Sequence, residues 1–72
     1  MVYRPSIDRL LGQGGIVIET VPGERRASGV VRVAGQLWSA ETDWPESISP
    51  GTPVLIVGRD GLILSVLPER RG

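Results

Sequence analysis

Cysteine, histidine and lysine are all absent from the sequence, and each absence excludes a kind of chemistry. Without cysteine the chain forms neither a disulfide nor a thiolate metal site. Without histidine it has no imidazole to serve as a general base, a neutral metal ligand or a pH switch. Without lysine it cannot form a Schiff base. The serine hydroxyls have no base to activate them, so we expect no catalytic residues, no cofactor and no enzyme activity.

An excess of charge of one sign and a long apolar run are also missing. All eight basic residues are arginines and eight acidic residues balance them, so the net charge is zero. Nucleic-acid binders usually carry a basic excess, because much of their affinity comes from neutralising phosphates. The longest apolar runs, such as Val54–Val57, are far shorter than a bilayer span, and no signal-peptide pattern is present. The composition therefore argues against a nucleic-acid partner and against a membrane-spanning segment within this sequence.

Short apolar runs separated by glycine and proline make up most of the sequence. Its 72 residues suffice for one small domain, and its ten glycines and six prolines fall between the runs, as turn residues do. The runs predict five strands, at residues 16–21, 29–33, 36–42, 53–58 and 62–67. Five short strands with turns between them indicate an all-β fold, a small five-stranded barrel. We expect the barrel over residues 12–69, after a lead-in or linker at 1–11 and before a tail at 70–72.

Side-chain alternation predicts the pairing of the second and third strands. A two-residue loop at Ala34–Gly35 places Val31 opposite Trp38. Trp38 and Ala40 then share the apolar inner face, whereas Arg32 points outward, since side chains alternate along a strand. Trp38 is therefore expected to fill the interior of the barrel rather than to offer an exposed stacking surface.

The last two strands admit two loop lengths. A two-residue loop at Asp60–Gly61 places Ser65 opposite Ile56, on the face that should be buried. A three-residue loop that includes Arg59 pairs Ile56 with Leu64 and turns Ser65 outward, and it explains the glycine as a left-handed turn residue. We prefer the three-residue loop.

Two local clusters have the composition of ligand sites, and each has a plainer interpretation. Glu41, Asp43 and Glu46 form a local group of carboxylates, which suits a weak metal site or, in the interpretation that we prefer, a solvated acidic loop. Gly12–Gly15 has the composition of a phosphate-binding loop. Such a loop follows a strand and opens a helix, whereas this one precedes a strand, so we interpret it as an entry turn. We therefore expect no metal site.

Binding, rather than catalysis, is the chemistry that the loops support. Arg25 and Arg26 lie between the first two strands, and arginine side chains suit phosphate and carboxylate partners. Trp44 lies in a long loop before a proline, and it either packs under one end of the barrel or forms an exposed anchor at an interface. These three residues are the candidate partner-binding residues. The alternative for the arginines is ordinary solvated loop charge beside Glu24.

An ordered series of residues resembles the C-terminal soluble domain of NfeD-like proteins. The series begins with Gly12, Gly15 and the triplet Thr20–Pro22, and its middle is Gly35-x-x-Trp38-x-Ala40. The remaining matches are glycine, proline and aliphatic residues of the later strands and loops, namely Gly29, Val31, Ile48, Gly51, Val54, Ile56, Gly61, Leu64, Val66 and Pro68. The resemblance covers nearly all of the chain from Leu10 to Pro68. One departure is the segment Gly23–Ser28, which looks longer than the family's usual first loop.

The resemblance implies a five-stranded OB-fold barrel that serves as a non-catalytic protein-interaction module. Proteins of this family are membrane-associated, with membrane helices that would lie upstream of Val2 and a soluble domain expected in the cytoplasm. The implied partners are stomatin- and flotillin-like membrane-scaffold proteins, and no small-molecule substrate is implied. Two alternatives stay open: an OB-fold binder of single-stranded nucleic acid, which would use exposed aromatic and basic residues, and a purely structural adaptor barrel.

Overall fold

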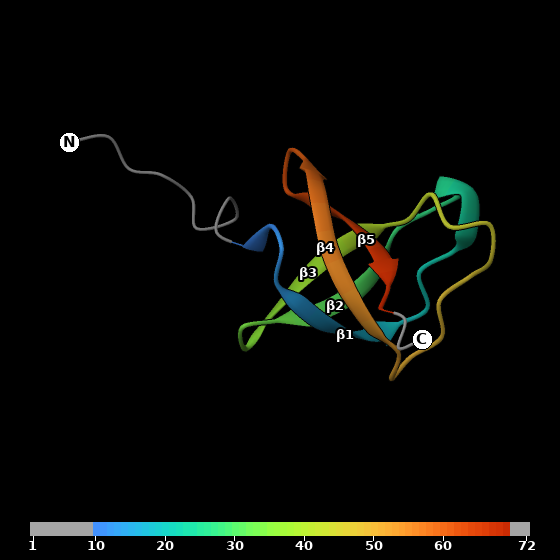
Figure 1. Cartoon of the computed structure of the whole chain (residues 1–72). Coiled ribbons are helices and arrows are strands. Elements are labelled where there is room, and N and C mark those ends of the chain that lie inside the picture. The colour runs from blue at the N-terminus through green and yellow to red at the C-terminus, as the bar shows by residue number, and fades with distance from the viewer. Residues whose placement is uncertain (1–9, 70–72) are drawn as a thin grey trace.

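The computed structural model describes residues 10–69, which form a closed β-barrel (Figure 1). The strands are β1 (Gly14–Glu19), β2 (Gly29–Val33), β3 (Gln36–Glu41), β4 (Pro53–Asp60) and β5 (Ile63–Pro68), and a short 3-10 turn, η2 (Gly23–Arg25), follows β1. The strand order is β1-β2-β3-β5-β4, and β1 pairs with β4 to close the barrel. The β3–β5 pair is parallel and the other pairs are antiparallel. The predicted all-β, five-stranded OB-fold barrel is confirmed.

The interior of the barrel is filled by aliphatic side chains, because alternate residues of each strand point inward. The buried residues of the strands include Val17, Val31, Val33, Val54, Ile56, Leu64 and Val66. Leu10, which lies in the segment expected as a lead-in, is buried in the same core. Backbone hydrogen bonds from Gly12 N to Ile56 O (2.8 Å) and from Ile56 N to Gln13 O (2.9 Å) attach the following residues to β4. Residues 1–9 of the expected lead-in and the expected tail at 70–72 lie outside the described residues, whereas Leu11 is described and exposed.

The hairpin of β2 and β3 has the predicted register. Val33 pairs with Gln36 and Val31 with Trp38. Ala34 and Gly35 have φ angles of 51° and 81°, as a two-residue turn of this handedness requires. Trp38 packs against the core, so its predicted inward orientation is confirmed. It is only half-buried, however, and the prediction that it fills the interior was wrong, because aliphatic side chains occupy that space. Its indole Nε1 is buried and has no hydrogen-bond partner among the described residues.

The hairpin of β4 and β5 differs from the prediction. Its turn is Gly61–Leu62, and Ile56 pairs with Val66 rather than with Leu64. The three-residue loop was wrong because Val57 forms a bulge, which takes up one residue of β4 without a partner in β5. The turn glycine does have the expected positive φ, at 64°.

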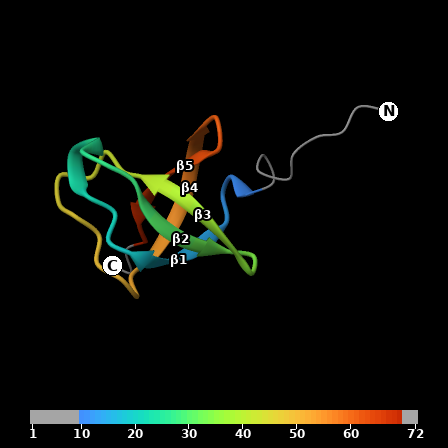
Figure 2. The same cartoon turned by 180° about the vertical axis from the view of Figure 1, so that it is seen from behind.

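The two long connections of the chain meet at one end of the barrel. Seen from opposite sides, η2 and the connection from β3 to β4 lie side by side at this end, while the β2–β3 turn lies at the other (Figures 1 and 2). Val21 and Ile48, both buried, form a bridge between the two connections. We refer to residues 23–26, which are η2 and the residue that follows it, and residues 42–47 together as the loop end.

Candidate functional site

The backbone of η2 is bonded directly to the connection that follows β3. The amide of Glu24 donates to the carbonyl of Trp44 and the amide of Arg25 donates to the carbonyl of Thr42, each at 2.8 Å. Both donors have left-handed backbones, with φ angles of 58° and 54°. Such angles are strained for residues other than glycine, and the two hydrogen bonds hold them. Backbone hydrogen bonds therefore hold the loop end in a defined conformation.

Gly23 allows these two segments to approach closely. A Cβ atom at this position would lie 2.7 Å from the backbone carbon of Glu46, so any side chain would force the segments apart. The amide of Gly23 also donates to the hydroxyl of Ser47 at 3.3 Å. The segment that begins at Gly23 is thus packed against the opposite connection.

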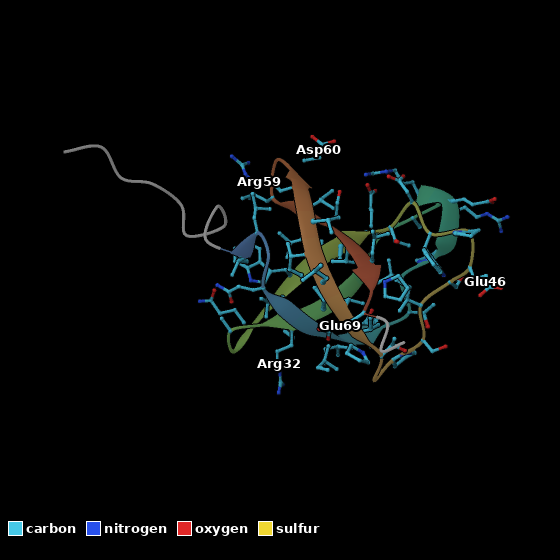
Figure 3. The ribbon with its side chains drawn as sticks, in the orientation of Figure 1. Arg32, Glu46, Arg59, Asp60 and Glu69 are labelled. Atoms are coloured by element: carbon cyan, nitrogen blue, oxygen red, sulfur yellow. The ribbon has the colours of Figure 1, made fainter. Side chains whose placement is uncertain are left out.

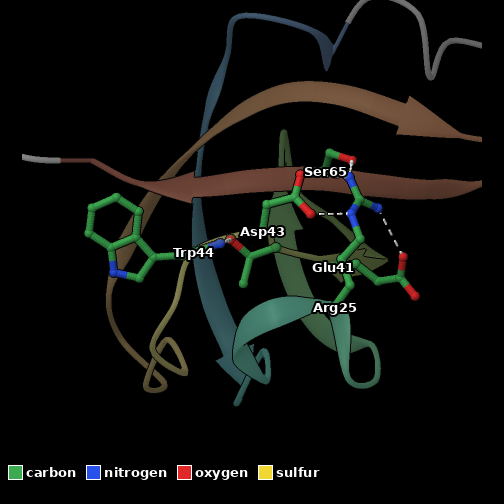
Figure 4. A network of polar contacts seen from close by, with 6 residues as sticks. Arg25, Glu41, Asp43, Trp44 and Ser65 are labelled. Carbon is green, nitrogen blue, oxygen red and sulfur yellow. Dashed lines mark hydrogen bonds and ion pairs between the residues drawn. The ribbon is translucent and has the colours of Figure 1, made fainter.

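The guanidinium of Arg25 binds three side chains, two from β3 and the connection after it and one from β5 (Figure 4). Its Nε and Nη2 donate to the two carboxylate oxygens of Asp43, the second at 3.2 Å. Its Nη1 contacts Oε1 of Glu41, at the end of β3, at 3.2 Å. Nη2 also donates to Oγ of Ser65 in β5 at 3.1 Å. We refer to these four residues as the Arg25 network.

The network changes the protonation equilibria of two of its members. The hydrogen bond from Arg25 holds the pKa of Asp43 below its ordinary value, and the charge of the guanidinium adds to this effect. The same hydrogen bond and the charge of the carboxylate raise the pKa of Arg25. Both groups are therefore charged at neutral pH, and the guanidinium of Arg25 is already occupied by partners within the chain.

The three predicted partner-binding residues share the loop end but differ in availability. Arg26 forms an ion pair with Glu24 at 3.0 Å, and its side chain is 76% exposed. Trp44 is half-buried, and its indole points away from the Arg25 network (Figure 4). Its backbone amide donates to the hydroxyl of the buried Thr42 at 3.1 Å. Arg26 and part of Trp44 are thus accessible, whereas Arg25 is engaged.

The acidic residues near the loop end do not converge on a metal position. Two of the three clustered carboxylates, Glu41 and Asp43, bind Arg25 instead. Within residues 10–69, no three histidine, cysteine, aspartate or glutamate side chains gather in a way that could hold a metal ion.

Sequence reasoning missed an apolar surface on the outside of β1 and β4. Ile16 and Leu55 are 42% and 37% exposed, and Val57 is 50% exposed. Ile16 pairs with Pro53, and Gly14 pairs with Leu55, so these residues lie on adjoining strands. We refer to Ile16, Pro53 and Leu55 as the outer apolar face. The sequence did contain a signal for this surface. The runs 16–18 and 54–57 are apolar at every position, whereas a strand with one buried face needs an apolar residue only at every second position.

A shallow hollow of about 440 Å³ adjoins the outer apolar face. Gly14, Ile16 and Pro53 contribute apolar walls, and Arg32 and Glu69 contribute the charged groups. Figure 3 shows Arg32 projecting away from the barrel and Glu69 where β5 ends. Among the described residues neither charged side chain has an ion-pair or hydrogen-bond partner, in contrast to Arg25.

The fold and these two surfaces define a class of protein, a small OB-fold barrel whose accessible features suit the binding of a partner. The particular family follows from its sequence. Residues 7–68 match the family described as NfeD-like C-terminal, partner-binding domain, and the chain belongs to this family. The resemblance stated from the glycine and tryptophan pattern is thereby confirmed.

Relatives of the chain include a large membrane protein. Over 68 residues the chain is 34% identical to the membrane-bound protease PH1510 of Pyrococcus horikoshii. The aligned part is 94% of this chain but only 14% of that protein. The chain therefore spans a small fraction of the curated relative that it matches, and the name of that relative describes the whole protein.

Three solved structures share the fold at 30–34% sequence identity. The C-terminal domain of the stomatin operon partner protein 1510-C from Pyrococcus horikoshii is 33% identical, with a TM-score of 0.78 over 89% of this chain and 94% of that chain. The soluble domain of the NfeD protein YuaF from Bacillus subtilis is 34% identical, with a TM-score of 0.77 over 92% and 81% of the two chains. A soluble domain from Corynebacterium glutamicum, of a membrane protein implicated in regulating membrane protease activity, is 30% identical, with a TM-score of 0.77 over 88% and 97%.

In the described part of this chain, no helix has the length and apolar character needed to cross a bilayer.

Proposed function

We propose that this domain binds a stomatin- or flotillin-like membrane-scaffold protein and has no catalytic role of its own. The observation that carries the proposal is the match of residues 7–68 to a partner-binding domain, together with the stomatin operon partner among the solved relatives. The composition supports a non-catalytic role, because the chain has no histidine, lysine or cysteine to act as a general base or a nucleophile. The relatives described as membrane proteins support a membrane-associated protein. A cytoplasmic position of the soluble domain is part of the proposal and rests on the family resemblance alone.

Trp44 and Arg26 remain the proposed contacts at the loop end, and Arg25 remains a candidate residue that acts through them. Arg26 has an exposed side chain that can reach a partner, and Trp44 combines an accessible aromatic surface with a fixed backbone. For Arg25 we propose an indirect role, because its ion pairs with Glu41 and Asp43 fix the backbone on which the other two residues are carried.

Isothermal titration calorimetry of the purified domain with a purified stomatin-like protein tests this function. We expect saturable binding, and absence of binding at every accessible concentration would overturn the proposal. Trp44→Ala and Arg26→Glu are expected to weaken binding by about tenfold each, the effect of losing roughly 1.4 kcal/mol. Arg59→Glu makes the same change of charge in the β4–β5 hairpin and serves as the matched control. Wild-type affinity in both loop-end variants would remove the loop end from the interface.

A further inference from the structure

Strands β1 and β4 carry apolar residues on a face that the barrel does not bury. Ile16 and Ile18 flank the buried Val17 in β1, and Leu55 lies between two buried residues in β4. The solvated face of an antiparallel sheet is normally polar, and strands that are apolar on both faces are typical of strands covered on both sides. Because β1 and β4 pair directly, their outward-facing apolar residues form one continuous surface rather than isolated exposed side chains. This surface has the composition of one that a second protein covers.

The two glycines of the β1 strand differ in what the fold requires of them. A Cβ atom at Gly15 would lie 2.8 Å from both the carbonyl oxygen of Arg32 and a methyl group of Val33, so packing excludes a side chain there. At Gly14 the nearest atom would be the carbonyl oxygen of Val54 at 3.6 Å, an ordinary contact. Its φ also lies outside the left-handed region that favours glycine. The barrel therefore does not need glycine at position 14, yet this glycine keeps the hollow open.

Charges of opposite sign flank the same hollow. Arg32 lies next to Ile16 through the pairing of β1 with β2, and Glu69 is attached beside Pro53 by a backbone hydrogen bond of 2.9 Å. Neither has a partner within residues 10–69. A nucleic acid or an anionic lipid would satisfy the arginine and be repelled by the glutamate, whereas a protein segment can present both signs of charge.

We propose that the hollow and the outer apolar face form a second docking surface for the stomatin-like partner, in addition to the contacts proposed at the loop end. The partner contributes a segment with an aliphatic side chain that fills the space over Gly14, an acidic group that meets Arg32 and a basic group that meets Glu69. This inference rests on the proposed function and adds to it the contact surface and the chemistry of the partner segment.

A pair of glycine substitutions tests the docking surface without disturbing the core. Gly14→Val fills the hollow in a strand position that has room for a Cβ atom. Gly58→Val is the matched control, because Gly58 is also a strand glycine, its Cβ would meet only the Cβ of Ser65 at 3.8 Å, and it does not line the hollow. In calorimetric titration with the purified stomatin-like protein, we expect Gly14→Val to bind about tenfold more weakly or worse, and Gly58→Val to bind as the wild type does.

A second variant covers the case in which Gly14→Val does not fold. Arg32→Glu changes an exposed side chain that has no ion-pair or hydrogen-bond partner within residues 10–69. It leaves packing intact, so it is expected to keep the thermal midpoint while weakening binding to a similar extent.

The outcomes separate this inference from the function on which it rests. If the wild-type domain binds the stomatin-like protein and both Gly14→Val and Arg32→Glu retain its affinity, the docking surface is overturned and the proposed function stands. If the wild type does not bind at all, both are overturned. If sedimentation shows that the wild type self-associates and that Gly14→Val is a monomer, the surface is an interface between two copies of this chain, which also overturns the proposal.

Discussion

Trp38 carries two opposing contributions to stability in one side chain. Its ring packs against the barrel core, which favours folding, but its Nε1 is buried without a hydrogen-bond partner among the described residues, which opposes it. The neighbouring Val31 pairs with it across the strands and adds a β-branched contact. Trp38 therefore belongs to the scaffold, although part of its side chain stays accessible.

Two substitutions separate these contributions. Trp38→Ala is expected to lower the free energy of unfolding by about 3 kcal/mol, the lower end for a large aromatic residue because the side chain is only half-buried. Trp38→Phe keeps an aromatic ring and removes the N–H group that has no partner among the described residues. The decrease in the free energy of unfolding should therefore be much smaller for this variant. Urea unfolding measures both, and equal losses in the two variants would show that ring packing does not dominate.

Trp44 differs from Trp38 although both are half-buried. It lies at the loop end, and it is not among the side chains that pack against the barrel core. We therefore expect Trp44→Ala to unfold at a lower urea concentration than the wild type but at a higher one than Trp38→Ala. The sequence alone left the placement of Trp44 open, because a tryptophan before a proline suits both a packed end and an interface.

At the scale of elements, the Arg25 network joins η2 to β3 and β5, and we expect it to make the stability of the loop end depend on pH. The folded protein holds the pKa of Asp43 below its unfolded value of about 3.9. The carboxylate therefore stabilises the fold above that value, and its contribution is lost as the pH falls through the folded pKa. Asp43→Asn is expected to be less stable than the wild type at neutral pH and equally stable in strong acid.

Urea midpoints of the wild type and Asp43→Asn at several pH values measure this difference. Arg25→Gln removes the other half of the same pair, so the double variant should cost less than the sum of the single variants at neutral pH. The pair is exposed, so the effect is expected to shrink with added salt. A gap between wild type and Asp43→Asn that does not change with pH would contradict the assignment.

The hairpins show which elements could be predicted from sequence. The β2–β3 register followed from alternation, because Arg32 and Ser39 are polar and mark the outer face. The β4–β5 register did not, because β4 is apolar at every position from Val54 to Val57, so alternation cannot reveal where Val57 bulges. A local pattern specifies pairing only where it distinguishes the two faces.

The Arg25 network illustrates a second limit. Its contacts join residues that are 16, 18 and 40 positions apart, and no local pattern in the sequence connects them. The arginine was correctly placed in the loop after the first strand, but the barrel topology that brings Glu41, Asp43 and Ser65 to it emerges only when the strands are assembled. The sequence alone therefore did not reveal that contacts within the chain occupy the guanidinium of Arg25 and limit its availability to a partner.

At the scale of the whole molecule, balanced charge bears on the choice of partner. The chain has no net charge, and its inward tryptophan removes one aromatic platform that an OB-fold binder of nucleic acid would use. A labelled single-stranded oligonucleotide titrated at low salt should show only weak binding that disappears as salt is added. Tight binding that persists at higher salt would favour the nucleic-acid alternative over a protein partner.

The contrast between Gly14 and Gly15 has a consequence for how this domain would diverge over evolutionary time. Selection for folding alone would retain glycine at position 15, where a side chain collides with β2, and would leave position 14 free to drift. Selection for the docking surface proposed here would retain both. A lineage that lost its partner is therefore expected to keep the second glycine and to acquire side chains at the first, so that the loss is recorded in the sequence while the barrel stays unchanged.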